Sequence, residues 1–100
     1  MPELTVISWR DIPAQVTGGK GRHAARAQLS ERFQDAIDAA AMRAGLIGSD
    51  AYLEEWRREA RPCGDDLEAE VAAAASQLEL EYTDERLDRL IRASGEEERA

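Results

Sequence analysis

A long run of strand-forming residues lies near the start of the chain, over residues 4–16. It is rich in Val, Ile, Thr and Trp, which suit a pleated surface. Leu4, Val6 and Ile7 place apolar side chains on both faces of a strand, so we expect this strand to lie inside a sheet rather than at a wet edge.

Pro13 divides this run into two parts. It has no N–H to donate to a strand ladder, and it holds Ile12 in an extended conformation. We therefore expect the chain to bend between Asp11 and Ala14 and to continue as a second strand.

Glycines at positions 18, 19 and 21 predict a hairpin with a loose loop between the second strand and residues 23–29. Side chains alternate across a strand, so one face of this segment is cationic and the other is small and apolar. The first face carries Lys20, Arg22, Arg26 and Gln28; the second carries His23, Ala25, Ala27 and Leu29.

Helical spacing dominates from Ser30 onward. Apolar residues recur at three- and four-residue intervals between good N-cap residues and terminating glycines or prolines. The first expected helix runs from Ser30 to Gly45, and the second runs from Ser49 past Trp56 to Ala60. The third begins at a capping box of Asp65 with Glu68 and reaches Tyr82. The fourth begins at Thr83 and carries Leu87, Leu90 and Ile91 on one side.

This order predicts an α+β fold, with a small N-terminal antiparallel sheet of two to three strands packed against about four helices. One hundred residues suffice for one domain with a modest core. We expect a single domain over residues 1–95 and a disordered acidic tail over residues 96–100.

Charge is distributed unevenly along the chain. The net charge is −8; residues 1–30 hold four Lys or Arg against two Asp or Glu, and residues 31–100 hold nine against nineteen. An acidic chain disfavours a nucleic-acid partner. The sequence shows no signal peptide and no membrane span, and Cys63 stands alone, so we expect a cytoplasmic protein without an internal disulfide.

No complete catalytic or metal-binding motif is found. A phosphate-binding P-loop would need Gly at position 14 and Ser or Thr at position 21, where the chain has Ala14 and Gly21. Backbone amides beside Lys20 and Arg22 are a candidate anion site, with a flexible hairpin tip as the alternative. One His and one Cys do not make a metal site, and we expect no cofactor and no enzymatic activity.

The segment Trp9-Arg10-Asp11 has two interpretations. In the first, Trp9 packs on the helix of Phe33, while Arg10 and Asp11 pair locally or cap a neighbouring helix. In the second, the segment is an anchor for a protein partner, because aromatic and Arg side chains dominate protein interfaces.

Several short sequence segments resemble those of a small bacterial family labelled "virulence factor". They are residues 9–16, Leu29-Ser30 with Arg32-Phe33, residues 36–38 and 40–46, Asp50, and residues 52–56. The resemblance covers residues 3–58. It implies a domain related to the C-terminal part of conserved virulence factor C proteins and, for stand-alone members, an association with folate and corrinoid one-carbon metabolism, including methylenetetrahydrofolate reductase. It implies no catalytic residue.

The sequence thus predicts a small non-catalytic adaptor that binds another protein through its N-terminal sheet. The predicted contact residues are Trp9, Arg10, Asp11, Gln15, Arg22 and Arg26. The alternative is a small-molecule-binding accessory module of one-carbon metabolism, in which cations hold an acidic ligand such as a folate tail. Partner identity and oligomeric state are left open.

Overall fold

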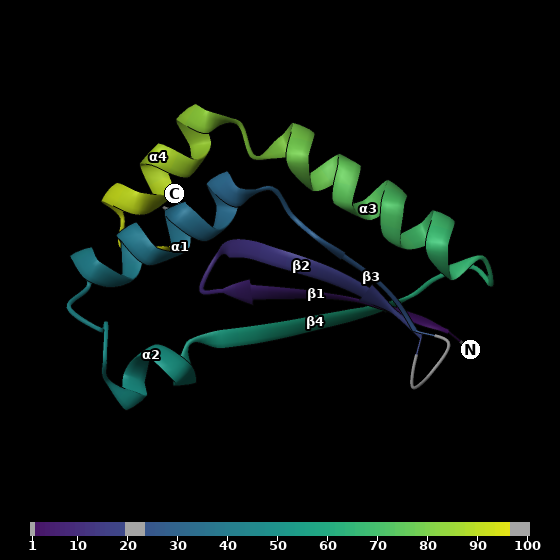
Figure 1. Cartoon of the computed structure of the whole chain (residues 1–100), viewed down its shortest axis with the longest axis horizontal. Helices are drawn as coiled ribbons and strands as arrows, with labels where there is room; N and C mark the ends of the chain where they lie inside the picture. The colour runs from purple at the N-terminus through teal and green to yellow at the C-terminus, as the bar shows by residue number, and fades with distance from the viewer. Residues whose placement is uncertain (1, 20–23, 97–100) are drawn as a thin grey trace.

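A computed structural model describes residues 2–19 and 24–96 as four strands and four helices. The strands form one antiparallel sheet in the order β3-β2-β1-β4 (Figure 1). The fold class α+β is confirmed. In chain order the elements are β1 (Glu3–Trp9), β2 (Ile12–Gly18), β3 (Ala25–Gln28), α1 (Glu31–Arg43), α2 (Asp50–Glu54), β4 (Trp56–Pro62), α3 (Leu67–Glu81) and α4 (Asp84–Arg92).

β1 is central, as its apolar run predicts, because it pairs with β2 on one side and with β4 on the other. The turn to β2 falls at Arg10 and Asp11, earlier than the predicted bend at residues 11–14. Arg10 closes this turn with a φ of 52°. Pro13 instead lies within β2 opposite Ser8, where the register shifts; a bulge tolerates a residue that has no N–H.

β4 corrects the sequence prediction, which placed residues 49–60 in one helix and gave the sheet two to three strands. The helix ends at Glu54, and Trp56–Pro62 pairs along the whole of β1. From Arg57 onward β4 is exposed on both faces. The hydrophobic alternation that identifies a strand is therefore missing, and pairing with β1 decides the structure.

The helices α1, α3 and α4 lie along one side of the sheet, and α2 lies at one end (Figure 1). α3 packs on β2 and β3, and α1 packs on β2 and α4. Gly18 permits the close approach of α3, since a Cβ atom there would lie 2.8 Å from Cγ2 of Val71. Leu4, Val16, Val71 and Ala74 form the buried cluster beneath α3, and a second cluster around Trp9 and Phe33 fills the other end.

The helices begin at the predicted N-cap residues, except that the cap of α3 is displaced by one residue. Thr83 caps α4 by accepting a hydrogen bond from the N–H of Arg86 at 3.2 Å. Asp66, one residue after the predicted Asp65, caps α3 by accepting from Ala69. Ser30 occupies the N-cap position of α1, but its side chain makes no capping hydrogen bond.

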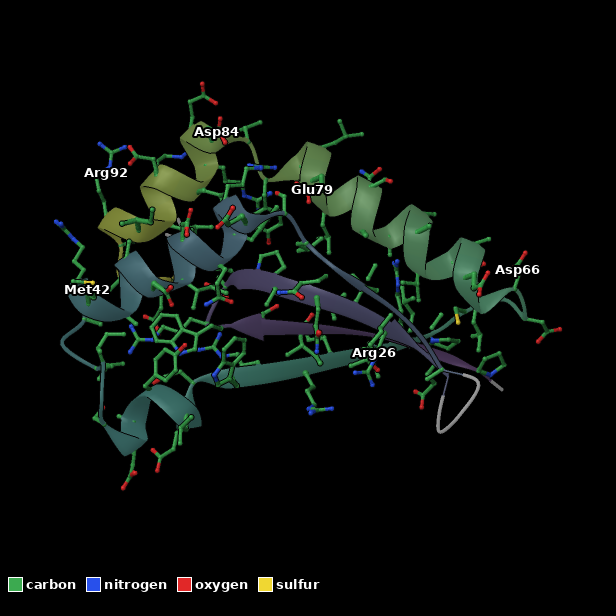
Figure 2. The ribbon with its side chains drawn as sticks, in the orientation of Figure 1. Arg26, Met42, Asp66, Glu79, Asp84 and Arg92 are labelled. Carbon is green, nitrogen blue, oxygen red and sulfur yellow. The ribbon has the colours of Figure 1, made fainter. Side chains whose placement is uncertain are left out.

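Ser30 instead joins α1 to α3 through Glu79, which Figure 2 marks on α3. Glu79 accepts hydrogen bonds from the Ser30 N–H at 2.7 Å, from the Ser30 hydroxyl at 2.8 Å and from Arg32 at 3.1 Å. Burial alone would raise the pKa of Glu79, but these hydrogen bonds and the charge of Arg32 outweigh it and lower the pKa. The ionised carboxylate therefore fastens the C-terminal half of α3 over the sheet.

Candidate functional site

One face of the sheet carries no helix across its middle. Leu4, Val6, Val16, Ala25 and Ala27 belong to the cluster beneath α3. Side chains alternate across a strand, so their neighbours point to the opposite face. We call this surface the open face; it consists of Thr5, Ile7, Gln15, Thr17, Arg26, Gln28, Arg58 and Ala60, none of which is buried.

Strand register arranges the open face in two rows. Arg26, Thr17, Thr5 and Ala60 lie side by side across the four strands, and the next row is formed by Gln28, Gln15, Ile7 and Arg58. Figure 2 shows Arg26 projecting on the side of the sheet away from α3. The result is a mostly polar platform, with the apolar side chain of Ile7 near its centre and Ala60 at the β4 margin.

The charge of the open face is opposite to that of the chain. Arg26 and Arg58 are exposed, and neither forms an ion pair with a residue that the structure describes. Glu3, at the margin of β1, is the acidic residue that strand alternation places on the same side. Cations on the surface of a protein with a net charge of −8 attract an acidic partner.

Trp9, a predicted contact residue, does not lie on this surface. Its side chain is 0% exposed, its Nε1 donates to the backbone oxygen of Tyr52 at 2.9 Å, and the two rings stack at 5.6 Å. It packs in the same cluster as Phe33. Trp9 therefore cannot touch a partner of the folded chain, and the first interpretation of this segment describes its packing.

Arg10 and Asp11 also make contacts within the chain. Arg10 donates to the backbone oxygen of Ser94 at 2.8 Å and pairs with Glu55 at 3.4 Å, and its side chain is 15% exposed. The N–H of Asp11 donates to Gly95, and its carboxylate pairs with Arg57 at 3.3 Å. The β1–β2 turn thus ties the sheet to the end of α4.

Gln15 and Arg26 are the predicted contact residues that the structure brings together on the open face. Arg22 and Lys20, the predicted anion site, lie outside the described residues, as does His23. Arg58 was missed because the sequence prediction put it in a helix. The combination of Arg57, Arg58, Glu59 and Arg61 with a closing Pro is typical of an edge strand and was the available signal.

Comparison with known proteins identifies the family. A family model described as "virulence factor" matches residues 7–91, more than half of the chain. The chain belongs to the virulence factor family. No curated protein and no solved structure matches it.

The match extends the resemblance, which ended at residue 58, through α3 and α4. Both C-terminal helices, α3 on the sheet and α4 against α1, therefore belong to the virulence factor domain. Across residues 2–19 and 24–96, no helix combines the length and the apolarity needed to cross a membrane. The same residues contain no group of three or more His, Cys, Asp or Glu suited to a metal ion.

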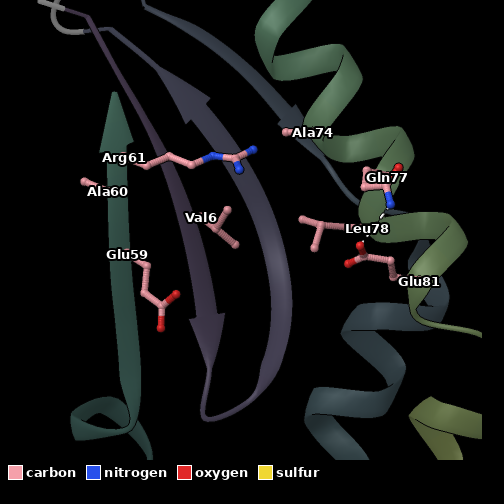
Figure 3. A pocket seen from close by; sticks show the side chains of 8 residues that line it. All are labelled: Val6, Glu59, Ala60, Arg61, Ala74, Gln77, Leu78 and Glu81. Atoms are coloured by element: carbon pink, nitrogen blue, oxygen red, sulfur yellow. Dashed lines mark hydrogen bonds between the residues drawn. The ribbon is translucent and has the colours of Figure 1, made fainter. Parts of the chain in front are cut away.

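A groove lies on the helix side of this virulence factor domain, between α3 and the strands β1 and β4 (Figure 3). It has a volume of about 280 Å³. Val6, Ala74 and Leu78 supply apolar wall, while Glu59 and Arg61 from β4 stand opposite α3. It exists because α3 packs on β2 and β3 and leaves β4 uncovered.

Cys63 follows β4 and is partly buried against the cluster beneath α3. Its N–H donates to the backbone oxygen of Pro2 at 3.1 Å. Burial raises the pKa of the Cys63 thiol, and the negative charge of Glu70 adds to this effect. A raised pKa leaves less of the thiol as reactive thiolate at neutral pH, so we expect Cys63 to react slowly with electrophiles.

Proposed function

We propose that this virulence factor domain is an adaptor that binds an acidic surface of another protein through its open face. The observation that supports the proposal is the cationic, helix-free face of the sheet on a strongly acidic chain. A β-sheet platform is pre-ordered, so binding requires little additional ordering of the backbone. Arg is also enriched among residues that contribute strongly to interfaces.

Arg26 and Arg58 stand on the outer strands of the platform, with Gln15 and Ile7 between them. The two guanidinium groups provide charge at the rim, and Ile7 provides the apolar centre that protein interfaces commonly have. Rim charges act chiefly on association rate and on salt dependence. Binding should therefore weaken as ionic strength rises.

The test is capture of partner proteins from cells that express the tagged chain at its natural level, followed by mass spectrometry. Arg26→Glu with Arg58→Glu reverses the charge of the open face. A matched control, Arg43→Glu with Arg89→Glu, makes the same change in net charge on the helices. A partner retained by the control and lost by the open-face variant supports the proposal; equal capture by both variants refutes it.

The resemblance gives a first specific bait, an enzyme of folate-dependent one-carbon metabolism such as methylenetetrahydrofolate reductase. Purified bait should bind the wild-type chain, and the affinity should fall with added salt. If the captured partner is a protein of another kind, the one-carbon enzyme is excluded as the partner, but the open-face proposal still stands. In this proposal the domain itself performs no reaction.

The groove gives a second candidate function, a small-molecule-binding module. Arg61 supplies a cation at the rim, but the carboxylates of Glu59 and Glu81 line the same groove and disfavour an anionic group there, and about 280 Å³ is just below the usual range of roughly 300–1,000 Å³ for ligand pockets. Calorimetry of the isolated chain with folates, corrinoids and flavins tests it. Heat that disappears in Arg61→Ala and persists in Arg26→Ala would favour this candidate over the adaptor.

A further inference from the structure

The outer edge of β4 presents backbone groups that no other described strand pairs. β4 is the last strand of the sheet. At one end the N–H of Cys63 donates to Pro2, and at the other the carbonyl of Glu55 accepts from the β1–β2 turn. Odd-numbered residues of this segment thus face β1, so Arg58 and Ala60 direct their N–H and C=O groups outward.

The side chains along this edge are mostly charged. Glu59 and Arg61 point to the helix side, where they border the groove that α3 leaves open (Figure 3). No ion pair or hydrogen bond joins either side chain to a described residue. Arg57, by contrast, is paired with Asp11. Charges on an edge repel most strands, so a strand that binds here must carry a complementary pattern.

We propose that the complementary strand is β4 of a second copy of this chain, paired antiparallel about a two-fold axis at Ala60. A two-fold axis sets the central residue against its own copy. Centring the pair on Arg57, Arg58, Glu59 or Arg61 would therefore place like charges directly opposite each other. Ala60 is the uncharged residue among these five positions.

With Ala60 at the centre, Glu59 of each copy lies opposite Arg61 of the other, on the helix side. Such opposite-charge pairs stabilise antiparallel strands, whereas like charges destabilise them. Arg58 lies opposite Pro62, so this register sets no like charges against each other. The sequence Glu59-Ala60-Arg61 is thus its own complement when read in the opposite direction.

The backbone fits the same register. Ala60 and Arg58 have outward N–H groups, so Ala60 of each copy donates to Ala60 of the other and Arg58 donates to Pro62. Pro62 has no N–H, and its place at the end of the strand limits the loss. The axis is perpendicular to the sheet, so the open faces of both copies lie on one side and form a continuous platform.

Charge reversal tests the register directly. Light scattering over a concentration series should give the wild-type chain twice its mass of 11.1 kDa. Arg61→Glu and Glu59→Arg each set like charges opposite at two symmetric positions, and either should weaken the dimer by about tenfold or more. The double variant Glu59→Arg with Arg61→Glu restores both pairs and should restore the dimer.

Ala60→Pro tests the backbone part of the interface. It removes an outward N–H without breaking a bond to β1, and edge strands tolerate such a proline. The variant should remain folded by circular dichroism and become monomeric. Arg26→Glu, which changes the charge on β3 instead, should stay dimeric.

Hydrogen exchange gives a second readout. The amides of Arg58 and Ala60 should be protected in the wild-type chain and should exchange rapidly in Arg61→Glu. A wild-type chain that stays at the mass of one copy at its highest soluble concentration would overturn the proposal. So would a dimer that persists in Arg61→Glu, or a double variant that stays monomeric.

Discussion

Replacing Trp9 by Ala removes the largest of the fully buried side chains. The indole fills the end of the core between the sheet and α1. It also stacks on Tyr52 and donates to the backbone oxygen of that residue at 2.9 Å. The substitution therefore removes packing and leaves a carbonyl without its donor.

The expected cost follows from these contacts. Replacing a large aromatic residue at a buried site by Ala costs about 3–5 kcal/mol of stability. This range includes roughly 1 kcal/mol for the lost hydrogen bond. Domains of this size are stable by about 5–15 kcal/mol in total. Trp9→Ala should thus lose about 4 kcal/mol and lower the midpoint of thermal unfolding by about 15–30 °C.

Urea unfolding followed by far-ultraviolet circular dichroism measures the free energy of unfolding of each variant. Trp9→Phe keeps most of the packing without the donor and should lose about 1–2 kcal/mol. Trp56→Ala is the matched control, because Trp56 is the direct strand partner of Trp9 but only half-buried. If Trp9→Ala costs no more than Trp56→Ala, the structural role assigned to the indole is refuted.

Three further predictions concern a carboxylate, a glycine and the thiol. The pKa of Glu79 is lowered in the folded chain, so the stabilisation by its carboxylate is fully present above the ordinary carboxyl pKa and declines below about pH 5 as the pH falls through the lowered value. In urea titrations, Glu79→Gln should reduce this part of the pH dependence of the free energy of unfolding. An unchanged pH profile would contradict the prediction. Gly95→Ala should cost about 1–3 kcal/mol of stability, because φ is 90° and the new Cβ would lie 2.8 Å from Cζ3 of Trp9. Gly45→Ala, with φ of 74° and no atom within 4 Å of the new Cβ, should cost only about 1 kcal/mol. Equal losses of the two variants in unfolding experiments would show that the clash with Trp9 does not contribute. Cys63 should react with iodoacetamide more slowly than free cysteine near pH 8 and at the ordinary rate in denaturant; a native rate as fast as the denatured one would show that burial does not protect the thiol.

Local sequence predicted the elements that carry apolar side chains on one side and polar side chains on the other. The stripe that contains Phe33 and Ile37 gave α1, and Thr83 gave the start of α4, because each signal depends on residues a few positions apart. The alternation of Arg26 and Gln28 with small apolar neighbours predicted both faces of β3. Family resemblance added the domain type, which the family match confirms.

The candidate site was predicted only in part. Gln15 and Arg26 were recognised as surface residues of the sheet, but Arg58 was not, because a strand exposed on both faces has no period to detect. Trp9 carried the signature of an interface anchor and of a core residue alike. Burial is set by what packs over a side chain, and α1 and α2 reach Trp9 only in the folded chain.

By itself, the sequence determined an acidic chain with a mildly cationic strand region, a central apolar strand and a series of capped helices. The tertiary structure decided that residues 56–62 form an edge strand and that α3 covers β2 and β3 rather than β4. Both outcomes depend on pairing and packing between segments distant in sequence, whose energies no local pattern encodes. The same long-range packing leaves one face of the sheet and the outer edge of β4 uncovered by the other described elements.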